Sequence, residues 1–504
     1  MILLVKRMTQ NPLVVRAMSS SESYEEAVRT LNKLQSNAAY IRAVRKHNVS
    51  TNTGLEDTKK YLLRSGVTLD QLDLLKIIHV AGTKGKGSTC AFIESILRHH
   101  GFLTGFYSSP HLISVRERFR INGQPINEPT FTQFFWKCYK SLESKKEHEN
   151  DMPQYFKFLT VMMFHVFIEA KVDVAILEVG IGGECDCTNI VKNPICTGIS
   201  SLGLDHTSML GNTIEEIAFQ KSGIFKKNAP AFTVPQPLEA MNILEKRAVE
   251  KNCSLSIVPS VENYKWPNGT LDLKVPLKIQ NYNLSLAIQL ASSWIESTRN
   301  KISIKGNKSH FRKSTPILQS KIESLSNFSL ETTAIAISNC KWPGRTQILK
   351  GNSIDFFIDG AHTLESIESC ASWFRESTKN EKGKKFLIFN ATGDRDPEKL
   401  LAPLKRFRFD RVFLSPNLAG VKNVVDQENF SVGTDEQKKR CRRHFEIWGD
   451  GGVIVENVGE AFDLINDEIL GNERKAKVLI TGSLHLVGAA LFILDPDLSM
   501  TTNY

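Results

Sequence analysis

Short apolar runs alternate with amphipathic stretches along most of the chain. Residues 74–80, 172–179 and 195–201 are mostly apolar and predict buried strands. Residues 88–99 and 213–219 predict helices that follow such strands. Because strands that alternate with helices usually form parallel sheets, this pattern predicts a mostly parallel sheet covered by helices on both faces.

The same alternation returns after residue 342. Residues 354–358, 386–390, 411–414 and 478–481 predict strands, and residues 484–494 predict a helix. This region therefore forms a second α/β domain, smaller than the first.

The length of the chain requires more than one hydrophobic core, because 504 residues exceed what a single core usually holds. We expect an α/β fold with one domain at residues 23–297 and a smaller α/β domain at residues 342–504. Residues 298–341 are predicted to be a linker or insertion, since residues 298–327 are rich in Lys, Ser and Asn and contain few large apolar side chains.

The N-terminal residues have the composition of a mitochondrial presequence. Residues 1–20 carry three cationic side chains, and the first acid is Glu22. We therefore expect residues 1–22 to be a targeting segment and the protein to occur in the mitochondrial matrix. Met8 or Met18 could start a shorter, cytosolic product, and a disordered tail is the competing interpretation.

The overall charge favours anionic ligands. The formal net charge is +10, but the Lys and Arg residues are scattered and form no long basic stripe interleaved with aromatic residues. Nucleotides and polycarboxylates are therefore expected as partners, and nucleic acid is not. The longest apolar runs, residues 161–170 and 172–179, are too short to span a bilayer.

A glycine-rich segment between a predicted strand and a predicted helix is the strongest chemical signal. In GTKGKGST, residues 82–89, glycines let the backbone turn its N–H groups toward phosphate oxygens, and the helix N-terminus adds a positive dipole. Lys86 can reach the β- and γ-phosphates, and Ser88 can bind Mg²⁺. The common P-loop pattern places Ser or Thr directly after the lysine, whereas Gly87 intervenes here.

An acid at the end of another predicted strand suits the magnesium of a nucleotide. Glu178 ends an apolar run and is followed by three glycines and then by Asp186, Thr188 and Asn189. His206 and Lys221 lie further along the chain. Taken alone, each would be interpreted as an ordinary polar residue.

Together these segments resemble the folylpolyglutamate synthase family, which belongs to the superfamily of the Mur ligases. The resemblance rests on motifs that occur in the family's order: GTKGKGST, SSPHL followed by RERFRING, LEVGIGGECDCTN, SLGLDHTSMLGNT, QKSGIF, WPGRTQ and DGAHT. It covers the chain from about Glu25 to the C-terminus. It implies a P-loop ATPase domain like that of the Mur ligases, followed by the smaller Rossmann-like domain.

The resemblance also implies roles for individual residues. ATP would be bound by Gly82, Thr83, Lys84, Gly85, Lys86, Gly87, Ser88, Thr89, Gln280, Asn283, Arg345 and Asp359. Ser88, Glu178 and His206 would bind Mg²⁺, and folate or glutamate would contact Ser108, Ser109, His111, Arg118 and Ser483. The catalytic residues would be Lys86, His206, Lys221 and His362.

Two of these assignments depart from the family's pattern or extend it. Ile279 stands where the family has a histidine before Gln280 and Asn283, which affects the expected contact with adenine. Lys221 matches a lysine that is carbamylated in several relatives, and the modification would convert a cation into an anion that can approach a metal.

The reaction expected from the resemblance is ATP-dependent addition of L-glutamate to the γ-carboxylate of folates through an acyl phosphate. ATP is the cosubstrate, Mg²⁺ and a monovalent cation are the expected ions, and a monomer is expected. Dihydrofolate synthase is an alternative that the motifs do not separate. A non-catalytic nucleotide-binding regulator and a nucleic-acid-stimulated P-loop ATPase are further alternatives, which the intact set of motif residues and the inserted Gly87 disfavour.

Overall fold

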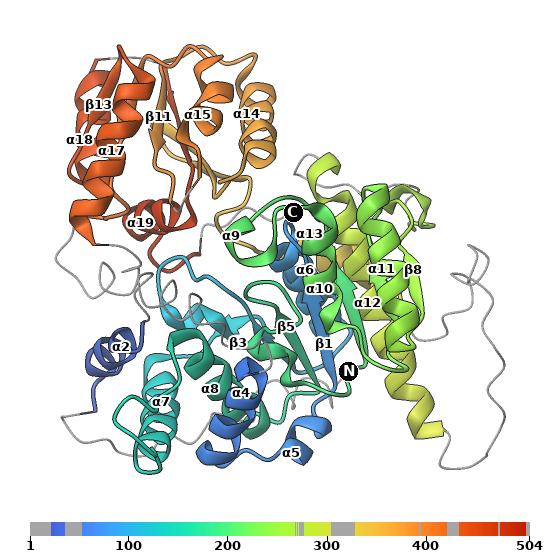
Figure 1. The fold of residues 1–504 in the computed structure, drawn as a ribbon. Helices are drawn as coiled ribbons and strands as arrows, with labels where there is room; N and C mark the ends of the chain where they lie inside the picture. The colour runs from blue at the N-terminus through green and yellow to red at the C-terminus, as the bar shows by residue number, and fades with distance from the viewer. Residues whose placement is uncertain are drawn as a thin grey trace, which may run out of the picture. The chain divides into compact units, whose positions relative to one another are not determined.

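The computed structural model describes residues 22–35, 53–267, 269, 271, 277–303, 328–392, 395–420, 433–471 and 474–499. These residues form two compact units. The first unit contains the described residues up to Ser109 and those from Arg118 to Cys340. The second contains Pro110–Glu117 and the described residues from Lys341 onward. Figure 1 shows the elements of both units. The expected presequence, with Met8 and Met18, lies outside the described residues apart from Glu22.

The first unit is built on an eight-stranded sheet with the order β4-β3-β2-β5-β1-β6-β7-β8. Six of its strands run parallel, and β3 and β4 add an antiparallel edge. The strands are β1 (Ile77–Ala81), β2 (Thr104–Tyr107), β3 (Phe119–Ile121), β4 (Gln124–Pro125), β5 (Val174–Glu178), β6 (Cys196–Ile199), β7 (Ala231–Thr233) and β8 (Leu255–Ile257). The prediction of a mostly parallel sheet is confirmed.

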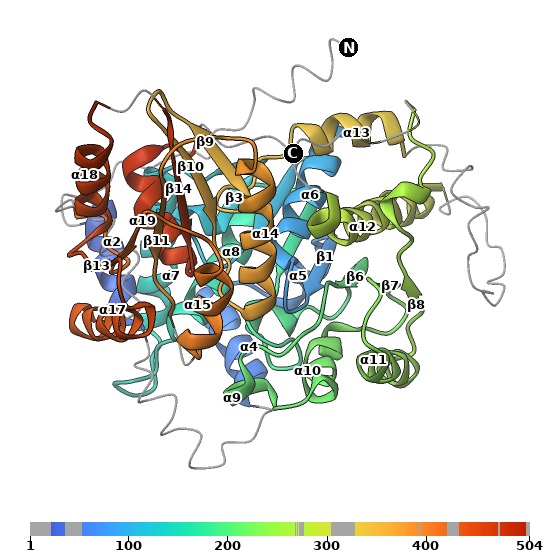
Figure 2. The ribbon, with the colours of Figure 1, turned by 90° about the horizontal axis from the view of Figure 1, so that it is seen from above.

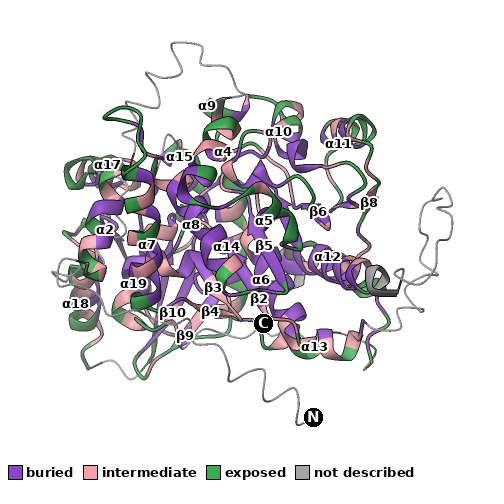
Figure 3. Ribbon diagram, turned by 90° about the horizontal axis from the view of Figure 1, so that it is seen from below, coloured by how far each residue is buried: buried purple, intermediate pink, exposed green. Residues whose placement is uncertain are grey.

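Helices cover both faces of this sheet. On β6, Gly198 faces Leu290 of α12, whereas its neighbour Ile199 packs in a cluster with Ala218 of α10 and Leu244 of α11. Successive residues of a strand point to opposite faces, so these helices lie on opposite sides of the sheet. Helix α6 runs beside α12 (Figure 2). The central strands β1, β2, β5 and β6 are fully buried between the two helical layers, whereas the edge strands β4 and β8 are partly exposed (Figure 3).

The helices of the first unit have the following bounds. They are α2 (Tyr24–Lys33), α4 (Thr53–Ser65), α5 (Leu69–Leu74), α6 (Lys86–His99), α7 (Glu128–Glu143), α8 (Tyr155–Glu169), α9 (Thr207–Leu210), α10 (Ile214–Lys221), α11 (Leu238–Lys251), α12 (Leu277–Ser303) and α13 (Leu330–Ser338). Among the described helices, none combines the length and apolar character needed to cross a membrane.

Two predictions at element boundaries are wrong. Leu74, expected to begin a strand, is the last residue of α5 and is 80% exposed, and β1 begins only at Ile77. The polar segment expected as a linker from residue 298 begins inside α12, which continues to Ser303, because Lys, Ser and Asn lower helix propensity only modestly. Residues 304–327 lie outside the described part of the chain.

The second unit contains a six-stranded sheet with the order β13-β12-β11-β14-β10-β9. Only β9 is antiparallel to its neighbour. The strands are β9 (Gln347–Lys350), β10 (Ile354–Asp359), β11 (Lys385–Phe389), β12 (Arg411–Leu414), β13 (Gly452–Ile454) and β14 (Ala476–Thr481). The helices are α14 (Leu364–Thr378), α15 (Pro397–Lys405), α17 (Thr434–Trp448), α18 (Val458–Ile469) and α19 (Leu484–Leu494). The four strands and the helix predicted here are confirmed.

Separate apolar clusters lie on the two faces of this second sheet. One joins the strands to α18 and α19, and the other joins them to α14, α15 and α17. The segment Pro110–Glu117 contributes Leu112 and Ile113 to the first of these clusters, beside Val487 of α19. The Glu117 carboxylate fixes the turn by accepting the backbone N–H groups of Leu112, Ile113 and Ser114 at 3.1, 2.8 and 2.7 Å.

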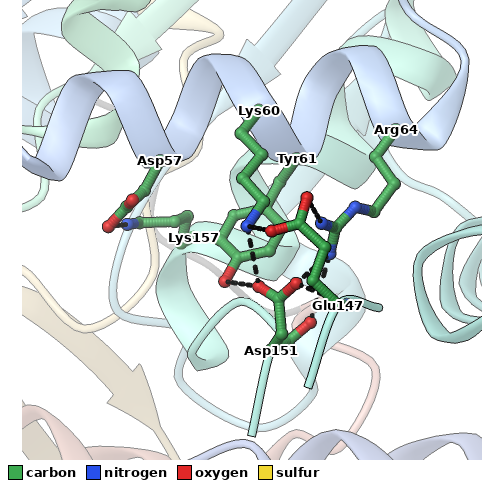
Figure 4. A network of polar contacts seen from close by, with 7 residues as sticks. All are labelled: Asp57, Lys60, Tyr61, Arg64, Glu147, Asp151 and Lys157. Carbon is green, nitrogen blue, oxygen red and sulfur yellow. Dashed lines mark hydrogen bonds and ion pairs between the residues drawn. The ribbon is translucent and has the colours of Figure 1, made fainter. Parts of the chain in front are cut away.

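A network of polar and charged side chains joins α4 to α8 and to the residues between α7 and α8 (Figure 4). We call it the α4 network, and its members are Asp57, Lys60, Tyr61, Arg64, Glu147, Asp151 and Lys157. Arg64 donates to the Asp151 carboxylate at 2.8 Å and to Glu147 at 3.1 Å, and Lys60 contacts the same two acids. Burial alone would raise the pKa of Asp151. Hydrogen bonds from the Glu147 amide, Arg64, Lys60 and Tyr61 outweigh that effect and keep this pKa well below its usual range.

Candidate active site

The glycine-rich segment connects β1 to α6, as the sequence predicted. The N–H groups of Thr83 and Lys84 donate to the Ser201 carbonyl at 2.9 and 3.0 Å, so these two amides are used within the fold. The N–H groups of Lys86 and the next residues of α6 have no acceptor within the helix, as in the first turn of any helix. An anion such as a phosphate group would therefore meet the start of α6.

Gly85 brings this segment against α12. It has φ +84°, and a Cβ atom placed on it would lie 2.0 Å from Oδ1 of Asn283. The Asn283 amide in turn donates to Gln280 at 2.9 Å. Both amide residues are buried beside the phosphate loop, so the structure brings these two predicted ATP residues to that loop despite the isoleucine at position 279.

Two lysines converge on a single backbone carbonyl. Nζ of Lys86 and Nζ of Lys221 donate to the Gly82 oxygen at 3.0 and 2.9 Å. Burial, followed by the positive charge of Lys86, lowers the pKa of Lys221 to about 7. Near neutral pH, Lys221 is therefore present both as an ammonium ion and as a neutral amine.

The next motif places an acid and a strained histidine beside this loop. Lys84 forms an ion pair with Asp205 at 3.3 Å, and the Thr83 hydroxyl donates to the Gly203 carbonyl at 3.1 Å. His206 precedes α9 in the left-handed conformation, with φ 53° and ψ 37°. Its backbone N–H donates to the Asp205 carboxylate at 3.0 Å.

The predicted magnesium residues provide oxygen donors of the right kind. Glu178 ends β5, and its Oε2 accepts the Ser109 N–H at 3.0 Å. Ser88 lies in the first turn of α6, and its hydroxyl makes no hydrogen bond to the described part of the chain. Among the described residues, no three His, Cys, Asp or Glu side chains converge as a metal cage. A site with few protein ligands fits Mg²⁺, which keeps waters and nucleotide oxygens in its shell.

The second unit holds its predicted residues near the carboxyl end of β10. The Asp359 carboxylate accepts the Thr346 N–H at 2.8 Å. Burial raises the pKa of Asp359, and the charge of Arg345 opposes that shift. Nδ1 of His362 lies 2.7 Å from the Gly360 carbonyl. Since a carbonyl can only accept, Nδ1 carries the proton of the neutral ring, and Nε2 is its basic nitrogen.

Sequence comparison gives near full-length matches to characterised relatives. The Homo sapiens protein named "Folylpolyglutamate synthase, mitochondrial" is 39% identical, and the alignment covers 95% of this chain and 93% of the human protein. The Candida albicans "Folylpolyglutamate synthase" is 38% identical, with 94% of this chain and 96% of that protein covered. This chain belongs to the folylpolyglutamate synthase family.

Solved structures related to the folylpolyglutamate synthase family share the fold. "E.coli FolC in complex with DHPP and ADP" is 25% identical, with a TM-score of 0.66 over 95% of this chain and 99% of that chain. The "apo form of L. casei FPGS" has a TM-score of 0.69 at 22% identity, over 94% of this chain and 99% of that one. A scan against protein-family models returned no match. The predicted family and the two-part α/β fold are confirmed.

The residues that this chain is expected to use for folate and glutamate occupy different environments. Ser109 lies beside Glu178 in the first unit, and the Arg118 guanidinium is 5.4 Å from the Tyr155 ring centroid. His111 belongs to the second unit and is buried there. Ser483 caps α19, where its hydroxyl accepts the His485 N–H at 3.2 Å. The roles given to these residues stay predictions.

Sequence reasoning missed three kinds of residue in this member of the folylpolyglutamate synthase family. Asp205, which pairs with Lys84, stood in a recognised motif but received no role. Ser201 accepts from the phosphate loop through its backbone, and a backbone role leaves no signal in side-chain identity. His79 is a polar residue inside the apolar strand β1, and that anomaly could have identified it.

Proposed function

We propose that this chain is an ATP-dependent ligase that adds L-glutamate to the γ-carboxylate of folates and forms ADP and phosphate. The observation that carries the proposal is the convergence of Lys86 and Lys221 at the Gly82 carbonyl, beside the open N-terminus of α6. Membership of the folylpolyglutamate synthase family supplies the identity of the substrates.

The reaction would proceed in two displacements. A carboxylate oxygen of the folate attacks the γ-phosphorus of ATP, the bond to the β,γ-bridging oxygen breaks, and ADP leaves with that electron pair. The amine of glutamate then attacks the acyl carbon, the carbon–oxygen bond to phosphate breaks, and the amine releases a proton. Lys86 would stabilise the negative charge on the transferring phosphoryl group.

Ser88 and Glu178, together with His206, would hold the magnesium of the nucleotide. Mg²⁺ would neutralise charge on the β- and γ-phosphate oxygens, which is its usual role in phosphoryl transfer. The argument for Ser88 and Glu178 is their donor chemistry: a hydroxyl with no partner among the described residues and a carboxylate at a strand end. A monovalent cation completes the proposed set of ions.

Lys221 would become a carbamate. Its neutral amine nitrogen would attack the carbon of CO₂ and form an N–C bond, while one C=O π bond breaks to give the carboxylate oxygen and the nitrogen loses a proton. The pKa of about 7 supplies the neutral amine. Intact-mass measurement after trapping in bicarbonate buffer would detect the added CO₂, and its absence would restrict Lys221 to the role of an amine.

The second unit would bind the incoming glutamate. Arg345 and Asp359 would reach the nucleotide, and His362 and Ser483 would contact the amino acid. Support comes from the half-buried Asp359 carboxylate and from His362, whose Nδ1 lies 2.7 Å from the Gly360 carbonyl and whose Nε2 is the basic nitrogen.

A product assay tests the proposed reaction. The protein is incubated with MgATP, tetrahydrofolate and labelled glutamate, and the products are identified by mass spectrometry. Folates lengthened by one or more glutamates are expected. Incorporation only with dihydropteroate as acceptor would instead establish dihydrofolate synthase, and no incorporation by folded protein would refute both.

Location and assembly complete the proposal. The human, Bos taurus and Cricetulus griseus relatives are named as mitochondrial proteins. The cationic N-terminal residues support a mitochondrial product, and starts at Met8 or Met18 would give a cytosolic one. N-terminal peptide mapping of the two fractions and sedimentation of the protein, expected as a monomer, test these points.

A further inference from the structure

Three polar side chains form a hydrogen-bonded series inside the first unit. His79 lies in the middle of β1 and is fully buried, three residues before Gly82. Its Nε2 is 2.8 Å from the Thr188 hydroxyl, which is 2.5 Å from Oδ1 of Asp186. Thr188 and Asp186 are also buried. We call this series the buried relay.

The directions of its hydrogen bonds follow from the chemistry of the groups. Asp186 accepts three further bonds, from the N–H groups of Thr188, Ile181 and Gly180, so its oxygens act throughout as acceptors. The Thr188 hydroxyl therefore donates to Asp186, and its oxygen accepts from Nε2–H of His79. Burial, followed by the charge of Lys226, lowers the pKa of His79 to about 3, so the ring is neutral.

The relay ends on the glycine-containing segment that follows Glu178. Oδ2 of Asp186 accepts the Ile181 N–H at 3.1 Å, so the carboxylate fixes the backbone where it leaves β5. At the other end of this segment, the Glu184 N–H donates at 2.7 Å to the carbonyl of Gln220, the residue before Lys221. Residues 180–183 thus connect the strand end that bears Glu178 to the helix end that bears Lys221.

Asp186 caps the short helix Cys187–Ile190, but a purely structural role would not require a histidine at position 79. An apolar side chain at position 79 would continue the apolar strand, whereas the buried imidazole is costly, because its Nδ1 has no hydrogen-bond partner among the described residues. Here the bonds of His79 and Thr188 lead to the backbone beside a proposed metal ligand.

We infer that His79, Thr188 and Asp186 are positioning residues of the ligase reaction, which hold residues 180–183 so that Glu178 and Lys221 are correctly placed. The inference rests on the proposed function, because it concerns the same site. It predicts that the relay affects turnover more than binding of ATP, since the segment that the relay holds, residues 180–183, is not part of the phosphate loop.

Substitution of Thr188 tests the relay at its centre. Thr188→Val keeps the shape and removes the hydroxyl, and we expect kcat to fall about 10–100-fold, as for other outer-shell partners of a metal site. The KM for ATP should change less than about threefold, and Thr188→Ser should restore kcat to within about threefold of the wild type. Wild-type kcat in Thr188→Val, or an equal loss in Thr188→Ser, would overturn the inference.

Thr378→Val is a matched control. Thr378 is also fully buried, and its hydroxyl donates at 2.8 Å to the Phe374 carbonyl within α14 of the second unit. The Thr378→Val variant therefore loses a buried threonine hydroxyl that is not part of the relay. We expect kcat and KM to stay at wild-type values. A loss of kcat equal to that of Thr188→Val would assign the effect to general destabilisation and refute the positioning role.

Hydrogen–deuterium exchange supplies a readout that does not need turnover. Peptides covering residues 179–184 should be protected in the wild type and should exchange at least about tenfold faster in Thr188→Val and Asp186→Asn. They should be unchanged in Thr378→Val. Unaltered exchange in both relay variants refutes the relay, whereas absent glutamate incorporation by the wild type refutes the proposed function, so the two failures are distinguishable.

Discussion

Cationic side chains cluster at two places in the first unit, the α4 network and the phosphate loop, and the two clusters differ in how acids pair with them. In the α4 network, Lys60 and Arg64 share the carboxylates of Glu147 and Asp151, and Lys157 pairs with Asp57 at 3.4 Å (Figure 4). Each of these cations has an acid partner within the fold. The network connects α4 to residues that follow α7, so its contacts contribute to the stability of the unit.

Fewer of the cations at the phosphate loop are paired with carboxylates. Lys84 pairs with Asp205, but Lys86 and Lys221 both donate to the Gly82 carbonyl, and neither forms an ion pair within the described part of the chain. Burial is the main cause of the lowered pKa of Lys221, and the positive charge of Lys86, which shares the same neutral oxygen, lowers it further. Under the proposed function, a bound polyphosphate would relieve the repulsion between these two charges.

The comparison distinguishes the cations of the α4 network, which stabilise the fold, from Lys86 and Lys221, which have no acid partner among the residues that the structure describes and are proposed to bind a ligand. Removing a member of the α4 network should reduce stability and leave turnover intact. Removing a lysine of the phosphate loop should reduce turnover without reducing stability.

Lys86→Ala should give the largest effect. The variant loses the charge that faces the transferring phosphoryl group, and we expect kcat for glutamate incorporation to fall about 10³-fold, the range found when one transition-state donor is removed. Turnover is measured by product analysis and folding by thermal melting. Lys60→Met, which removes a lysine of the α4 network, is the control and should keep kcat within about twofold. Equal kcat losses in the two variants would remove the distinction between the clusters.

Asp151→Asn should reduce the free energy of unfolding by about 3 kcal/mol, because Arg64 loses its buried partner and keeps only the exposed carboxylate of Glu147. Urea denaturation measures this difference, and kcat should stay near the wild-type value. The folded pKa of Asp151 is lowered, so its stabilisation is complete above the unfolded pKa of about 4 and decreases as the pH falls below it. A difference that is unchanged at pH 3 would contradict this account.

Lys221→Met should sharpen the comparison through its pH dependence. The folded pKa of about 7 lies below the unfolded value, so the unfolded chain binds more protons between about pH 7 and 10, and wild-type stability rises over that range. In bicarbonate-free buffer the variant should be more stable than the wild type at pH 7 by on the order of 2 kcal/mol, and the difference should shrink towards pH 10. If the stability difference between Lys221→Met and the wild type instead grew with pH, the lowered pKa of Lys221 would not explain it.

Lys157→Ala should have the smallest effect. Its partner Asp57 is 52% exposed, and exposed ion pairs contribute roughly 0.5 kcal/mol or less. Chemical denaturation of the variant should therefore differ little from that of the wild type. A loss comparable with that of Asp151→Asn would show that Lys157 has a larger role in the α4 network than its geometry indicates.

The sequence was sufficient to predict the local parts of the site. Periodicity and glycine placement predicted the connection from β1 through the phosphate loop to α6, and the position of Glu178 at a strand end. These features depend on neighbours in sequence, where pattern and structure are directly linked. The antiparallel strands β3, β4 and β9 were not predicted, since strands of two to four residues give little periodic signal.

Long-range pairings could not be read from the pattern. The bond from Lys221 to Gly82 spans 139 residues, and the bond from His79 to Thr188 spans 109. Each depends on the order of strands in the sheet, which places β5 and β6 on either side of β1. The prediction of a linker from residue 298 was wrong for a different reason. The polar composition was interpreted as that of a linker, although a helix can also contain Lys, Ser and Asn.

The segment Pro110–Glu117 has a consequence for any attempt to divide the protein. Leu112 and Ile113 belong to the core of the second unit although they precede most of the first unit in the chain. The approach is so close that a Cβ atom on Gly488 would lie 1.9 Å from the Leu112 carbonyl oxygen. A fragment that begins at residue 341 would lack this piece of its core, and a fragment that ends at residue 340 would expose it to water. Separately expressed halves should therefore be insoluble or recombine on mixing.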